Sequence, residues 1–238
     1  MDTKQKKLIY TDADIRLLRS LAEELRLPLL QIARQAELAS MKHSASSNMR
    51  VIEITAEAAI RLVDSYLFST QILLGQQTLP LEPVSVSAAM QDTAQYLCKL
   101  ARIYDCEIDV QVRGKCGLVM ASTQGLQAAL TSLVYTFIGS HPERKRQRIV
   151  LTARRDGRAV VAGVMANNML EKNILADARQ LYGRAHQPAA TMTHKSGAGI
   201  YIADSLFRSM STELQVFHHR KYAGLAATLL PSYQTTLL

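Results

Sequence analysis

The chain has 238 residues, of which 48% are hydrophobic, 20% charged and 5% aromatic. This length and composition predict one large or two modest globular domains, with cores of Leu, Ile, Val, Ala and Met, and exclude a disordered chain. Lys and Arg outnumber Asp and Glu by 28 to 20, a net charge of +8 that favours acidic partners. Cys98, Cys106 and Cys116 lack paired spacing. We therefore expect a reducing environment, no disulfide scaffold and no metal site.

Membrane targeting is not indicated by the hydrophobic pattern. No stretch approaches about 20 uninterrupted apolar residues. The lysines of residues 1–10 are not followed by an apolar segment of signal-peptide length. We therefore expect a cytoplasmic protein with no membrane partner.

Residues 11–76 predict an antiparallel helical hairpin. Thr11 and Asp12 precede an apolar stripe with helical spacing that continues to about Met41, and Pro28 predicts a kink in this helix. Polar residues at 43–48 predict a turn before a second helix over 49–74. Because two helices bury little surface, the hairpin needs either its own second domain or a second copy, and a homodimer forming a four-helix bundle is expected.

A second domain is predicted over residues 84–238, after a proline-containing linker at 77–83; residues 1–10 are a tail. Helical and alternating patterns in this domain predict an α/β sandwich, and the whole chain is thus α+β. The expected helices span 87–103, 123–138 and 200–210, and the expected strands span 107–112, 149–153, 159–164, 214–217 and 225–230.

A basic segment runs from Arg144 to Arg158. A nucleic-acid interface would carry aromatic residues among these charges to stack on bases, and this segment has none. The pattern therefore favours a solvated loop and strand face, and a regulator that contacts nucleic acid through this segment is the less favoured alternative.

The first helix contains the string Glu-Glu-Leu-Arg-Leu-Pro-Leu-Leu-Gln-Ile at residues 23–32, which resembles the phosphoacceptor box of sensor histidine kinases. Further strings resemble the entry to that family's catalytic domain, its asparagine box, its second glycine box and its closing strand. They lie, in family order, at 79–86, 120–130, 196–203 and 229–231. The resemblance implies a dimerisation hairpin followed by an ATPase-type sandwich of the histidine kinase/GHKL class.

The phosphoacceptor box departs from the family at the reacting position. Glu23 replaces the histidine, while Glu24, Arg26 and Pro28 match the box. Leu27 stands where phosphatase members carry a polar residue that orients water. A carboxylate would form only a labile acyl phosphate, and an apolar side chain cannot orient water, so we expect no catalytic residue here.

The nucleotide boxes also depart from the family. Ser132, Thr136 and Gly139 stand at the asparagine-box positions that hold magnesium and contact phosphate, and Ala166 replaces the aspartate that recognises adenine. The remnants of a nucleotide site are therefore Ser132, Thr136, Asn167, Asn168, Gly197 and Gly199.

These departures predict a pseudokinase: a dimeric module that docks a response-regulator receiver domain or a partner histidine kinase, without a cofactor. The alternative is an atypical ATP-binding kinase or phosphotransferase, in which Ser132, Thr136 and the 197–199 loop hold Mg-ATP weakly.

Overall fold

The computed structural model describes residues 47–139, 146–167, 174–180, 197–219 and 221–232, and shorter pieces at 29–30, 32–34, 36–39 and 41. The pieces between 29 and 41 are helical, and α2 spans Ser47–Leu73, which confirms the helix predicted over 49–74. The predicted tail and the phosphoacceptor box from Glu23 to Pro28 lie outside the described residues.

A five-stranded mixed sheet forms the centre of the second part of the chain, with strand order β2-β4-β5-β7-β6. β2 is parallel to β4, and the other neighbours are antiparallel. The strands are β2 Cys106–Arg113, β4 Gln147–Asp156, β5 Ala159–Ala166, β6 Gln215–His219 and β7 Tyr222–Leu229. Gly157, with φ of 60°, provides the positive φ in the β4–β5 turn. All five strands confirm the sequence prediction.

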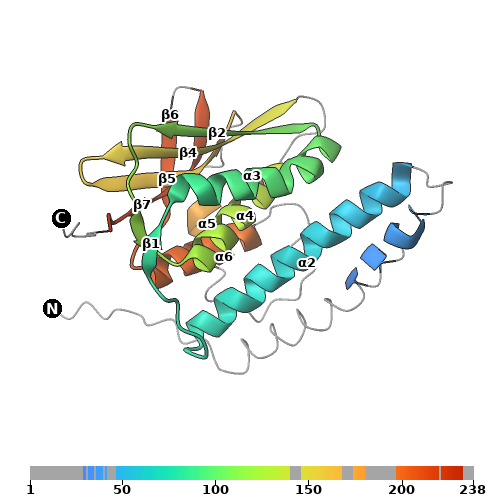
Figure 1. Ribbon diagram of the computed structural model, residues 1–238, viewed down its shortest axis with the longest axis horizontal. Helices are drawn as coiled ribbons and strands as arrows, with labels where there is room; N and C mark the ends of the chain where they lie inside the picture. The colour runs from blue at the N-terminus through green and yellow to red at the C-terminus, as the bar shows by residue number, and fades with distance from the viewer. Residues whose placement is uncertain are drawn as a thin grey trace, which may run out of the picture.

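Helices α3 (Val86–Ile103), α4 (Thr123–Gly139) and α6 (Gly197–Ser209) cover one face of this sheet (Figure 1). α3 begins at a capping residue, because the Ser85 hydroxyl accepts a hydrogen bond from the backbone N–H of Ala88 at 3.3 Å. The fully buried side chains of these helices meet alternate residues of the strands. The predicted α/β sandwich is therefore present.

Three short elements were not predicted. β1 (Glu82–Val84) and β3 (Val119–Ala121) form a separate two-stranded antiparallel sheet, and β1 begins inside the predicted linker. α5 (Ile174–Gln180) packs on α6. Strands of three residues and a helix of two turns are too short to show a periodic pattern.

The α2 helix packs directly on the sandwich, against α3, α4 and α6. Ala58 and Phe68 of α2 belong to the same buried cluster as the core of the sandwich. The Arg61 guanidinium also lies 3.8 Å from the ring centroid of Tyr96 on α3. The α2 helix and the sandwich therefore share one core. Within the described part of the chain, no helix is long and apolar enough to cross a membrane.

Candidate functional site

Ser132 and Thr136 lie one turn apart on α4, on the side of the helix that faces α6. The Ser132 hydroxyl donates to the Ala128 carbonyl at 2.8 Å, and the Thr136 hydroxyl donates to the Ser132 carbonyl at 2.9 Å. Their exposed fractions are 0% and 3%. Both hydroxyl protons are thus used within α4, as is common for Ser and Thr in helix interiors.

The second glycine box lies inside a helix rather than in a loop before it. α6 begins at Gly197, three residues earlier than predicted, so Gly197 and Gly199 both belong to its first turn. A methyl group at Gly199 would overlap the Thr136 hydroxyl and would lie 2.6 Å from the Ser132 carbonyl oxygen. Gly199 therefore allows α6 to approach α4 closely, over the two asparagine-box positions.

β5 ends at Ala166, and Asn167 follows directly after the strand. Ala166 is fully buried in the core under the helices. Asn167 is exposed, and its side-chain oxygen accepts a hydrogen bond from the backbone N–H of Arg148 at 3.2 Å. Asn167 therefore does not replace an aspartate at position 166, and Asn168 lies outside the described residues.

The structure thus brings Ser132, Thr136 and Gly199 together and places Asn167 elsewhere. Gly197 begins the same helix as Gly199. Glu23, Glu24, Arg26 and Pro28 lie in the part of the chain that the structure does not describe. No group of three His, Cys, Asp or Glu side chains arranged for a metal ion occurs among the described residues.

A network of charges on α6 was not predicted. Asp204 is fully buried and accepts hydrogen bonds from Arg179 of α5 at 3.1 and 3.0 Å. Arg208, one turn further along α6, lies 3.1 Å from the same carboxylate, and the backbone N–H of Leu214 donates to it at 3.3 Å. This network attaches α5 to α6. Only the i, i+4 spacing of Asp204 and Arg208 could have indicated part of it.

A cleft of about 720 Å³ lies between α2 and α3, apart from the nucleotide-box residues. Burial raises the pKa of the Tyr96 phenol at this boundary, and Arg61 partly opposes that shift. The lining residues carry charges of both signs, so the cleft has no clear preference for an anion or a cation. They are Arg50, Glu53, Ile54, Glu57 and Ala58 of α2 and residues 95–100 of α3.

The protein has the fold of histidine kinase catalytic domains. Full-length ShkA in complex with AMPPNP matches with a TM-score of 0.57 and 18% identity, over 91% of this chain and 45% of that chain. AdeS of Acinetobacter baumannii matches with a TM-score of 0.54 and 9% identity, over 85% and 94% of the two chains. The catalytic domain of ThkA matches with a TM-score of 0.51 and 10% identity, over 63% and 95%.

The ShkA and AdeS matches cover more of this chain than the ThkA catalytic domain does, so the likeness extends beyond the sandwich. No protein-family model and no curated protein matches the sequence.

Proposed function

We propose that this chain is a two-component signalling protein that has lost autokinase activity and acts as a dimeric docking module. Its partner is a response-regulator receiver domain or a histidine kinase. The observation that carries the proposal is the close contact of α4 with α6, in which Gly199 lies against Thr136 and Ser132.

The chemistry of that contact supports a loss of nucleotide binding. Magnesium bound to ATP needs oxygen ligands that are open to the ion. Ser132 and Thr136 are buried and bonded within their own helix. The methyl group of Ala166 cannot accept a hydrogen bond from the adenine amino group. Three contributions to nucleotide binding are therefore missing together.

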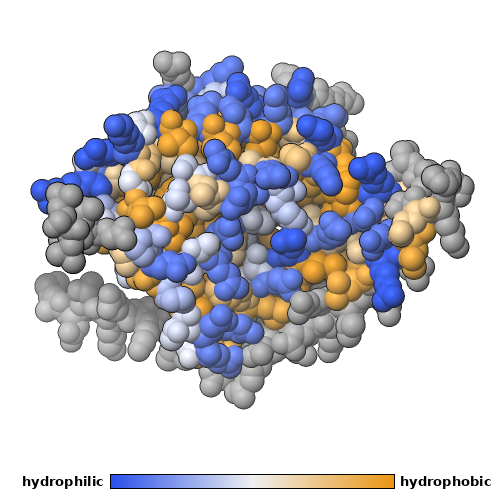
Figure 2. Space-filling model, in the orientation of Figure 1, coloured by the Kyte–Doolittle hydropathy of each residue, from blue (hydrophilic) through white to orange (hydrophobic). Residues whose placement is uncertain are grey.

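A docking role is supported by the apolar surface of the hairpin. Large hydrophobic side chains are more than a third exposed on α2 and on the helical pieces before it, and Figure 2 shows apolar residues at the right-hand end of the molecule, where α2 begins. A second copy of the hairpin would cover such a surface and complete a four-helix bundle. The exposed residues are Leu30, Ile32, Leu38, Met41, Met49, Val51, Ile52 and Leu73.

Glu23 supplies a negative charge where the family has its phosphohistidine, and we propose that this charge takes part in recognition of the partner. The test is a titration of the full chain against purified receiver domains and histidine kinases from the same organism. We expect saturable binding to at least one of them, weakened by Glu23→Ala.

The matched control is Asp92→Ala, which removes an exposed carboxylate from α3 without touching the hairpin. This variant should bind as the unmodified chain does. Failure of the chain to bind any receiver domain or kinase would contradict the proposal. An equal loss of binding in Glu23→Ala and Asp92→Ala would contradict a specific role of Glu23 in recognition.

A further inference from the structure

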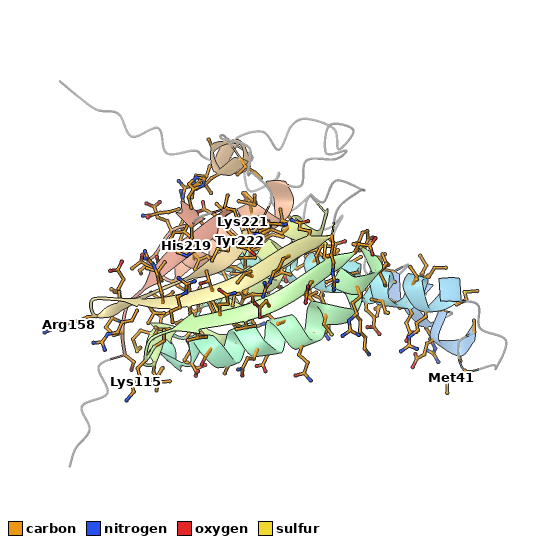
Figure 3. All side chains as sticks on the ribbon, turned by 90° about the horizontal axis from the view of Figure 1, so that it is seen from above. Met41, Lys115, Arg158, His219, Lys221 and Tyr222 are labelled. Carbon is orange, nitrogen blue, oxygen red and sulfur yellow. The ribbon has the colours of Figure 1, made fainter. Side chains whose placement is uncertain are left out.

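The sheet has an outer face that no described helix covers, and Figure 3 looks onto it. Because side chains alternate along a strand, Val150, Met165 and Ala226 point away from the helices. These three residues are nevertheless only 1%, 4% and 5% exposed, and they do not belong to the core under the helices. The middle of the outer face is therefore apolar and buried.

The sheet is strongly curled, so that side chains of distant strands meet on the outer face. An Arg113 nitrogen at the end of β2 lies 3.2 Å from His219 Nε2 on β6, although three strands separate β2 from β6. The Arg154 guanidinium of β4 lies 5.2 Å from the ring centroid of Phe217 on β6. The outer face is thus a concave surface on which opposite edges of the sheet meet.

Two glycines permit this curl. A methyl group at Gly163 of β5 would overlap the Leu225 carbonyl and lie 2.5 Å from the Ala226 Cα. A methyl group at Gly224 of β7 would likewise overlap the Val164 carbonyl. Because neither glycine has a side chain, β5 and β7 approach closely where the sheet bends.

The end of the sheet beside this concave face is strongly basic, and Arg113 and Arg154 lie on the concave face itself. Five Lys and Arg residues gather at the end of β2 and around the β4–β5 turn, with one acidic residue, Asp156, among them. Figure 3 shows Lys115 and Arg158 at this end. None of the five forms an ion pair in the described structure, whereas Arg146 and Arg148 pair with Glu107 and Asp109. The five are Arg113, Lys115, Arg154, Arg155 and Arg158, which we call the basic end.

Two aromatic rings lie beside the basic end. Phe217 and His219 are two residues apart on β6, so they share the outer face; their rings are within 5° of parallel, with centroids 6.4 Å apart. Both are half-buried. The sequence around the arginines has no aromatic residue, but the fold brings these rings from β6 to Arg154 and Arg113.

We infer that the curled outer face binds single-stranded nucleic acid, with phosphates on the basic end and bases stacked on Phe217 and His219. Arg113 donates a hydrogen bond to His219, which leaves its other N–H groups for a phosphate oxygen. Unpaired bases offer faces to aromatic rings, and the surrounding arginines neutralise the backbone. The bases of a duplex are stacked on each other, and an acidic peptide has no flat face for these rings.

The test measures binding of the full chain to fluorescent 20-nucleotide poly(dT) and poly(U) by anisotropy across a salt series. We expect the logarithm of the binding constant to fall linearly with the logarithm of the salt concentration. The double variant Arg113→Gln and Arg154→Gln should reduce the slope of this line by about 1.4, or about 0.7 for each lost charge. The control pair Lys99→Gln and Arg102→Gln removes the same charge from α3 and should leave the slope unchanged.

The aromatic part of the inference has its own variants. Phe217→Leu should weaken binding about tenfold, and Phe217→Tyr should keep it, because stacking needs a ring. Thermal melting of each variant checks that the fold is retained. Absence of oligonucleotide binding at low salt would overturn the inference. Binding of duplex DNA as tight as that of the single-stranded oligonucleotides would also overturn it. So would binding of polyglutamate with equal affinity, if Phe217→Leu leaves that affinity unchanged.

Discussion

The two faces of the five-stranded sheet differ in how they use polar groups. On the helix side, Ser132 and Thr136 are bonded within α4, and the buried Asp204 is surrounded by donors. On the outer side, Arg113 and Arg154 form no ion pairs in the described structure. Polar groups on the helix side stabilise the fold, whereas those on the outer side remain able to meet a partner.

The residues that stabilise the fold and those that could bind a partner thus lie on different faces of the sheet. The family resemblance places nucleotide chemistry on the helix side, where the structure has closed the contact between α4 and α6. Arginines without ion pairs and two half-buried aromatic rings lie on the outer side, to which the resemblance assigns nothing. Variants that separate α4 from α6, or β5 from β7, test whether the two faces differ in this way.

The largest effect is expected from Gly163→Ala. The added methyl group meets backbone atoms of β7, which cannot move aside without separating the strands. Overpacking of this kind should lower the free energy of unfolding by about 3 kcal/mol, measured by urea denaturation. Gly117→Ala is the matched control, because a methyl group there has no neighbour within 4 Å. Equal stability of the two variants would show that the sheet is not tightly curled.

Gly199→Ala tests the closed contact of α4 and α6. The new methyl group would displace the Thr136 hydroxyl and press on the Ser132 carbonyl, which is fixed within its helix. We expect the free energy of unfolding to fall by about 2 kcal/mol in the same assay. A neutral result, or a gain such as an alanine usually gives inside a helix, would mean that the two helices leave room for a ligand.

Asp204→Asn tests the buried charge on the helix side. The amide keeps one acceptor oxygen but loses the charge that Arg179 and Arg208 share. Because both arginines are partly exposed and can reach water, we expect a loss of about 1.5 kcal/mol in the free energy of unfolding. Proteolysis should then cut α5 faster than α3. Unchanged cleavage of α5 would contradict its attachment through Asp204.

The smallest effect is expected at the paired end of the outer face. Burial acts to raise the pKa of Asp109, but hydrogen bonds from Gln111 and Arg148 outweigh it, so that pKa lies below its ordinary value. A lowered folded-state pKa contributes stability above the unfolded pKa, about 3.9, and that stability is lost as pH falls through the folded pKa. Since the pair is partly exposed, the contribution should stay below about 1 kcal/mol.

Melting curves of the unmodified chain and of Asp109→Asn check this prediction between pH 7 and pH 3. The two should differ slightly at pH 7 and converge at low pH. Arg148→Gln should reproduce the behaviour of Asp109→Asn. A difference that grows as pH falls would contradict the sign of the shift.

Long periodic elements could be predicted from the sequence, because apolar spacing over four or more turns identifies helices such as α3 and α4. The nucleotide-box positions could be identified too. Their contacts could not be predicted, because the role of Gly199 depends on the distance between two helices, and the place of Asn167 depends on where β5 ends. The meeting of Arg154 with Phe217 depends on the curl of the whole sheet, which no local pattern encodes.

The most direct test of the central claim is equilibrium binding of Mg-ATP and Mg-AMPPNP to the full chain, by isothermal titration calorimetry to millimolar nucleotide, with the melting temperature measured in parallel. A ligand that binds only the folded state must raise that temperature. The closed α4–α6 contact predicts no binding heat and no shift. Saturable, magnesium-dependent binding that Thr136→Val abolishes would contradict it and would establish the atypical kinase instead.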